Sequence, residues 1–121
     1  VGLNSEEASA RGHRVESLTV PLAEVDRAVL DEMTDGFVRV HHECGRLLGC
    51  TIVATHANEM IGEATYAISQ HGTLSDISNT IHPYPTQIEA LRKAGDAYRR
   101  SLITPRLKWW LRRYFVWSRR W

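Results

Sequence analysis

The chain has 121 residues, of which 43% are hydrophobic and 24% charged, a length and composition that fit one domain with its own core. It contains no run of 18 or more apolar residues, so no membrane-spanning helix is expected. Its two cysteines, Cys44 and Cys50, are too few for a disulfide framework and favour a reducing, cytoplasmic location. The chain begins at Val1 rather than at methionine, which predicts a piece of a longer or processed protein.

The charges are distributed unevenly, although the net charge is only +1. Residues 1–96 hold all 14 acidic residues and seven of the 15 basic ones, whereas residues 97–121 hold the other eight basic residues. Because the acidic part would repel phosphate, nucleic acid is not an expected partner.

The first part of the chain predicts a short helix, a strand and a few helical turns. Residues 6–10 are predicted to form a short exposed helix that ends at Gly12. Residues 17–22 alternate apolar and polar side chains, which predicts a strand, and Pro21 favours a sheet edge or a strand end. One or two helical turns follow over residues 25–30.

Residues 37–43 and 46–55 predict an antiparallel hairpin, because both runs are rich in apolar and β-branched residues and each follows a turn signal. Cys44-Gly45 is the turn between them. Gly49, inside the second strand, indicates a bulge or the close approach of another backbone segment.

The second half of the chain predicts helices. Residues 57–70 have a helical apolar period that ends at Gly72, and a capping signature predicts a short helix over residues 73–78. The longest helix is expected over residues 86–103, with Pro105 after it.

A proline corner, residues 81–89, lies between the last two predicted helices. Each proline fixes its own φ and disfavours the helical region for the residue before it, so His82 and Tyr84 are held extended. Thr86 and Glu89 have the spacing of a capping box, which would start the long helix at once. A stiff corner that carries an imidazole and a phenol suits a functional site; the alternative is that it only ends one element and begins the next.

These elements predict an α+β domain over residues 1–104, with helices packed on an antiparallel sheet. Residues 105–121 are a separate basic and aromatic tail, predicted to be helical, that carries all four tryptophans.

The order of these segments resembles the C-terminal dimerisation domain of the FAD-dependent pyridine nucleotide–disulfide oxidoreductases. This family includes glutathione reductase, lipoamide dehydrogenase and mercuric reductase. The resemblance rests on segments that follow one another in the family's order: residues 1–8, 35–40, 46–49, 57–61 and 84–89. It implies that the domain's first strand lies upstream of Val1.

The segment from Tyr84 to Glu89 is similar to the family's His-Pro-Thr-x-x-Glu motif. In the thiol-handling members that histidine serves as acid and base at the partner subunit's flavin, steered by the glutamate. The resemblance therefore implies that Tyr84, as in mercuric reductase, and Glu89 contribute to the partner's active site. His82 is an additional residue, either a structural histidine bonded to nearby backbone or a minor catalytic contributor. Because no cysteine follows Cys50, the chain also departs from the mercuric reductases, which end in a cysteine pair.

The resemblance further implies a homodimer, with FAD and NAD(P)H bound by other domains of the parent chain. The 121-residue chain itself is expected to bind no flavin and to be inactive, because it has no GxGxxG loop and no Rossmann unit.

Each candidate residue has an alternative reading. Tyr84 also suits an interface where a tyrosine packs half exposed. His41 and His42 would point to opposite faces of a strand, which leaves His42 and Cys44 too few ligands for a metal site, so none is expected. The tail predicts either docking on the rest of the protein or peripheral membrane contact through Trp109, Trp110 and Trp117. A stand-alone membrane- or protein-binding module is therefore the second hypothesis.

Overall fold

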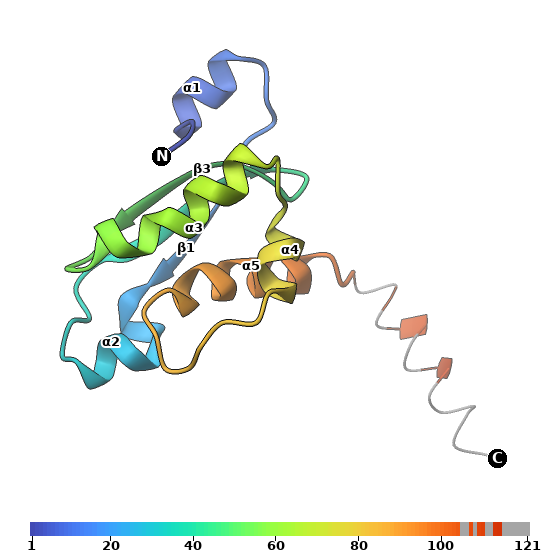
Figure 1. Cartoon of the computed structure of the whole chain (residues 1–121). Coiled ribbons are helices and arrows are strands. Elements are labelled where there is room, and N and C mark those ends of the chain that lie inside the picture. Colours follow the sequence, from blue (N-terminus) through green and yellow to red (C-terminus); the bar gives the residue numbers. More distant parts are fainter. Residues whose placement is uncertain (105–106, 108, 111–112, 115–121) are drawn as a thin grey trace.

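The computed structural model describes residues 1–104, 107, 109–110 and 113–114 (Figure 1). Its elements, in chain order, are α1 (Ser5–Ala10), β1 (Glu16–Pro21), a short 3-10 turn η1 (Leu22–Glu24), α2 (Asp26–Leu30), β2 (Phe37–Glu43), β3 (Arg46–Val53), α3 (Ala57–Ser69), α4 (Leu74–Asn79) and α5 (Glu89–Ser101). The predicted α+β class and the predicted order of elements are confirmed.

The three strands form an antiparallel sheet in the order β1-β2-β3. Val38 pairs with Val20 on one side and Ile52 on the other, and this row of apolar side chains faces the core. The predicted hairpin turn is present, with both Cys44 and Gly45 at positive φ, 48° and 87°.

The irregularity predicted at Gly49 is also confirmed. The pairing of β2 with β3 shifts between His41 and His42, so that Leu48 is an extra residue on β3. On the other edge of β3, Gly2 forms a bridge with Gly49, and a Cβ on Gly49 would collide with the backbone of Leu3. A glycine is required here because two backbones meet.

Val1–Leu3 thus adds a short extended segment to the outer edge of β3. The Leu3 N–H donates to the Leu48 carbonyl at 3.0 Å, and the Cys50 N–H donates to the Val1 carbonyl at 2.9 Å. An antiparallel strand upstream of Val1 would continue this pairing toward Val53. That strand remains a prediction.

One face of the sheet is covered by helices. Helix α3 packs on β3, and α5 packs on β1 and β2, while α4 lies against α5 (Figure 1). The core between these layers consists of apolar side chains that the sheet and the helices both contribute, among them Val20, Val38, Val40, Cys50, Met60, Ala64, Leu74, Leu91 and Ala94.

The predicted start of the longest helix was wrong. Helix α5 begins at Glu89, with Ile88 as its N-cap and no side-chain capping bond, rather than at Thr86. The Thr86 hydroxyl instead donates to the Pro83 carbonyl at 2.7 Å, which folds residues 83–86 into a turn of the corner. The Glu89 N–H, which would donate to the Thr86 hydroxyl in a capping box, donates instead to the Thr86 carbonyl at 3.3 Å. The capping box predicted for α4 does form, between Thr73 and Asp76.

The tail lies largely outside the described residues. Trp109 and Trp110 are exposed and meet edge to face, with ring centroids 5.8 Å apart. Trp117, the third tryptophan of the predicted membrane contact, lies outside the described residues. In the described part of the chain, no helix has the length and apolar character needed to cross a bilayer.

Candidate site at the proline corner

The proline corner connects α4 to α5 and presents Tyr84 at the surface. The Tyr84 side chain is 69% exposed, and the peptide between Tyr84 and Pro85 is cis. Pro83 is also exposed, so the phenol lies on a segment stiffened by a proline on each side. The exposure of Tyr84 is what a residue directed at another molecule requires.

Asp26 is the hydrogen-bond partner of Tyr84. The Tyr84 hydroxyl donates to Oδ2 of Asp26 at 2.9 Å, and Asp26 is the first residue of α2. This bond, then the charge of Asp26, slight burial and the charge of Glu89, raise the pKa of Tyr84, so the phenol stays protonated well above neutral pH. Sequence reasoning missed Asp26, because 58 residues separate it from Tyr84 and no local pattern links them.

His82 points inward, away from the exposed face of the corner. Its side chain is 4% exposed and lies beside α3. Nδ1 donates to the Thr80 carbonyl at 2.9 Å, which is the backbone contact expected of a structural histidine, and Nε2 lies 2.7 Å from Oε1 of Glu63. Because Nδ1 is the donor to a carbonyl, the contact with Glu63 needs a second proton, held on Nε2 or on the carboxyl group.

Glu89 begins α5 behind the corner. Its Oε2 atom is buried and has no hydrogen-bond partner in the part of the chain that the structure describes. Glu89 also lines a polar hollow of about 390 Å³ between β1 and α5, together with the cationic side chains of Arg92 and Lys93. The carboxylate is close enough to raise the pKa of Tyr84, although the hydroxyl itself bonds to Asp26.

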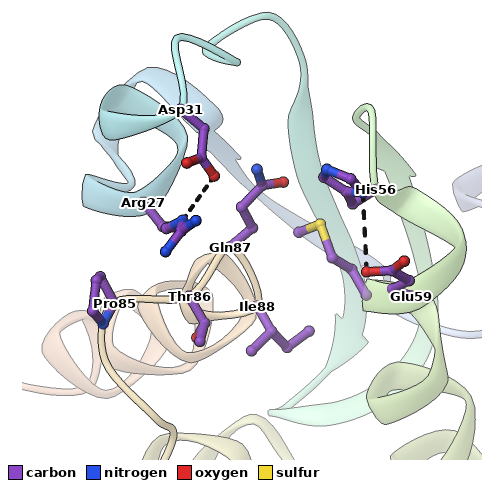
Figure 2. Close-up of a pocket in the computed structure, with 9 residues that line it drawn as sticks. Arg27, Asp31, His56, Glu59, Pro85, Thr86, Gln87 and Ile88 are labelled. Atoms are coloured by element: carbon purple, nitrogen blue, oxygen red, sulfur yellow. Dashed lines mark hydrogen bonds and ion pairs between the residues drawn. The ribbon is translucent and has the colours of Figure 1, made fainter.

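A second hollow, of about 400 Å³, is lined by residues 85–88 of the corner and by side chains at α2 and α3 (Figure 2). Gln87 stands in it between two ion pairs, Arg27–Asp31 at 2.7 Å and His56–Glu59 at 3.9 Å. The Gln87 side chain is almost fully buried, and its amide oxygen has no partner among the described residues. The corner therefore lines two hollows, one through Glu89 and the other through residues 85–88.

Both histidines of the hairpin are buried. His41 is 5% exposed and its Nδ1 lies 2.7 Å from the Ser17 hydroxyl, while His42 packs edge to face against Tyr98 at 5.1 Å. Burial lowers the pKa of both imidazoles, which keeps them neutral. Cys44 is exposed and Cys50 buried, and no group of three or more His, Cys, Asp or Glu among the described residues is arranged to hold a metal ion.

Residues 1–95 match the family described as "Pyridine nucleotide-disulphide oxidoreductase, dimerisation domain". The chain belongs to this family. The resemblance inferred from the order of the segments is confirmed, and the proline corner lies within the matched range.

Curated relatives of this dimerisation domain carry two enzyme names. A dihydrolipoyl dehydrogenase from Thermus scotoductus is 37% identical over 105 residues, which are 85% of this chain and 23% of the relative. A mercuric reductase from Shewanella putrefaciens is 31% identical over 104 residues, 84% of this chain and 19% of the relative. The chain thus spans about a fifth of the length of the relatives it matches.

Solved structures agree with the fold of the dimerisation domain. LpdA from Mycobacterium tuberculosis superposes with a TM-score of 0.73 at 25% identity, covering 80% of this chain and 22% of that one. The HOCl-induced flavoprotein disulfide reductase RclA from Escherichia coli gives 0.74 at 24% identity, covering 86% and 23%. At that identity the second likeness shows the fold alone.

Proposed function

We propose that this dimerisation domain joins two copies of a mercuric-reductase-like, FAD- and NAD(P)H-dependent oxidoreductase and presents Tyr84 to the partner subunit's active site. The observation that carries the proposal is the 69% exposure of Tyr84 on a proline-stiffened corner, within a domain of this family. A side chain held in place before the subunits meet loses little conformational entropy on assembly.

The described residues of this chain do not fit a dinucleotide site of their own. Their sheet is antiparallel, whereas dinucleotides bind at the carboxyl ends of parallel strands in βαβ units. The flavin, bound by the rest of the protein, would supply the electron transfer. This chain would contribute a protonated phenol at Tyr84, with the Glu89 carboxylate near enough to raise the pKa of that phenol.

We assign His82 a supporting part in the same proposal. Both of its ring nitrogens are bonded within the subunit, to Thr80 and Glu63, so the imidazole fixes the corner to α3. The isolated 121-residue chain would bind no flavin and have no activity. Two free cysteines, Cys44 and Cys50, fit a cytoplasmic location for the whole protein.

A hybrid-dimer experiment tests the presentation of Tyr84 across the interface. Full-length protein that carries Tyr84→Phe is expected to lose about a hundredfold in kcat with NADH or NADPH and a chromogenic aromatic disulfide. Mixing it with a subunit inactivated in its flavin-binding part restores activity, because one site then combines an intact flavin with an intact Tyr84.

Tyr66 provides the matched control, since it lies on α3 and is 68% exposed. Tyr66→Phe should keep full activity. If the mixed subunits regain nothing while the Tyr84→Phe homodimer is inactive, Tyr84 acts within its own subunit and the proposal fails. A full-length protein that sediments as a monomer at micromolar concentration would contradict the dimer itself.

A further inference from the structure

We propose that Asp26 is a positioning residue, which accepts the hydrogen bond of the Tyr84 hydroxyl and so leaves the exposed phenol oxygen as a hydrogen-bond acceptor for another molecule. The group that meets Tyr84 would then carry an N–H, O–H or S–H donor. This inference rests on the proposed function. It adds Asp26 to that site and specifies that the group facing Tyr84 is a hydrogen-bond donor.

The hydroxyl has a single proton, which already points to Asp26 in a hydrogen bond. A phenol has one O–H donor and two acceptor lone pairs, so a hydroxyl that donates to Oδ2 of Asp26 at 2.9 Å has only lone pairs left for another molecule. A hydrogen bond to a charged acceptor is stronger than one between neutral groups. An approaching acceptor would have to displace Asp26, whereas a donor would not.

Asp26 is itself firmly placed. Val25, the residue before it, and Ala28, two residues after it, are completely buried in the core. Next to them, Lys93 on α5 donates to the Glu24 carbonyl at 2.6 Å and ties the start of α2 to the helix that follows the corner. The carboxylate and the corner are therefore held by the same packed elements, and the direction of the Tyr84 hydroxyl is set before any partner arrives.

The negative charges near Tyr84 favour the neutral phenol over the phenolate, so the acceptor is a neutral hydroxyl oxygen. Asp26 on α2 and Glu89 at the start of α5 both raise the pKa of Tyr84. The phenol thus keeps its proton at neutral pH, and removal of Asp26 would take away the larger of the two influences.

Two measurements on Asp26→Ala test the inference. In the 121-residue chain labelled with ¹³Cζ-tyrosine, with the Tyr84 signal assigned by its loss in Tyr84→Phe, the pKa of Tyr84 should fall. In the full-length enzyme kcat/KM should drop about tenfold, as expected for a lost hydrogen bond to a charged group, and its alkaline limb should move to lower pH. Asp26→Asn, which keeps an acceptor oxygen without the charge, should give a smaller drop and the same direction of shift.

Asp35→Ala is the control, because Asp35 is an exposed carboxylate in the loop before β2. This substitution should change none of these values. If Tyr84→Phe is inactive while Asp26→Ala keeps wild-type kcat/KM and an unshifted alkaline limb, the role of Asp26 is refuted. An unchanged Tyr84 pKa in Asp26→Ala refutes it as well. If Tyr84→Phe is fully active, the proposed function fails instead, whatever the titration shows.

Discussion

The buried imidazole of His82 connects the corner to the rest of the domain. It is 4% exposed, and its two nitrogens contact the Thr80 carbonyl and the Glu63 carboxylate. Removing this buried side chain loses both hydrogen bonds together with the packing of the ring.

His82→Ala should therefore lower the free energy of unfolding by about 1–3 kcal/mol. Urea denaturation followed by circular dichroism measures this. His56→Ala is the control, because His56 is 45% exposed and 3.9 Å from Glu59, and it should change stability by less than about 0.5 kcal/mol. Equal effects of the two substitutions would show that the buried contacts of His82 do not hold the corner.

Glu43 connects the end of β2 to the segment after α1 and makes stability depend on pH. Its carboxylate accepts from His13 at 2.8 Å and from the Arg14 N–H at 2.7 Å, and these bonds, that of His13 first, hold the pKa of Glu43 below its usual range. Because the folded pKa lies below the unfolded one, the contribution is complete above the ordinary carboxyl pKa and is lost as pH falls through the lowered value.

Glu43→Gln should thus flatten the loss of thermal stability between about pH 6 and about pH 3. The midpoint of thermal unfolding, measured across that range for both proteins, gives the comparison. Glu59→Gln, with a side chain that is 82% exposed, should follow the wild-type curve. A Glu43→Gln curve parallel to wild type would mean that the bonds to His13 and Arg14 contribute nothing.

At the scale of elements, the contact between α4 and α5 depends on a glycine that helix propensity disfavours. A Cβ on Gly95 would lie 2.5 Å from the Leu74 carbonyl oxygen and 3.0 Å from the Ser78 nitrogen, and both are backbone atoms that do not move independently of α4. Gly62 in α3 has nothing within 4 Å of the same position. The two helical glycines therefore differ in surroundings but not in intrinsic propensity.

Glycine-to-alanine substitutions should have opposite signs at these positions. Gly62→Ala should raise the free energy of unfolding by about 0.5–1 kcal/mol through helix propensity alone. Gly95→Ala should lower it by about 1–3 kcal/mol, because overpacking outweighs the same propensity gain. Denaturant titrations measure the free energy of unfolding of both variants. If both substitutions stabilise the protein, α4 and α5 can move apart at little cost.

The elements were predictable wherever a local pattern specifies them. The alternation over β1, the turn at Cys44-Gly45 and the capping box of Thr73 each depend on neighbouring residues, and each was predicted. The start of α5 was not, because the Glu89 N–H donates to the Thr86 carbonyl in a turn rather than to the Thr86 hydroxyl in a cap. The contacts that orient the corner could not be predicted from local patterns at all. Tyr84 bonds to Asp26, 58 residues away in the sequence, and His82 bonds to Glu63, 19 residues away.

At the scale of the whole molecule, the two cysteines differ in how deeply the fold buries them. Cys44 is exposed in the hairpin turn, whereas Cys50 is 1% exposed between the sheet and the helices, and burial raises the pKa of its thiol to about 11. The thiolate is the reactive form, so Cys50 is protected twice, by inaccessibility and by its raised pKa. Its N–H also donates to the Val1 carbonyl, which closes that edge of β3.

Iodoacetamide should therefore modify Cys44 at once and Cys50 only when the core opens. Mass spectrometry over time should show one alkylated thiol within minutes and the second at a rate that rises with urea as steeply as global unfolding does. A second rate that is independent of urea would instead mean that the segment Val1–Leu3 detaches alone and uncovers Cys50 without unfolding the helices. His82→Ala should accelerate the modification of Cys50 by the factor that the measured loss of stability of this variant predicts. The reason is that Cys50 reacts only in globally unfolded molecules, and their fraction rises as stability falls.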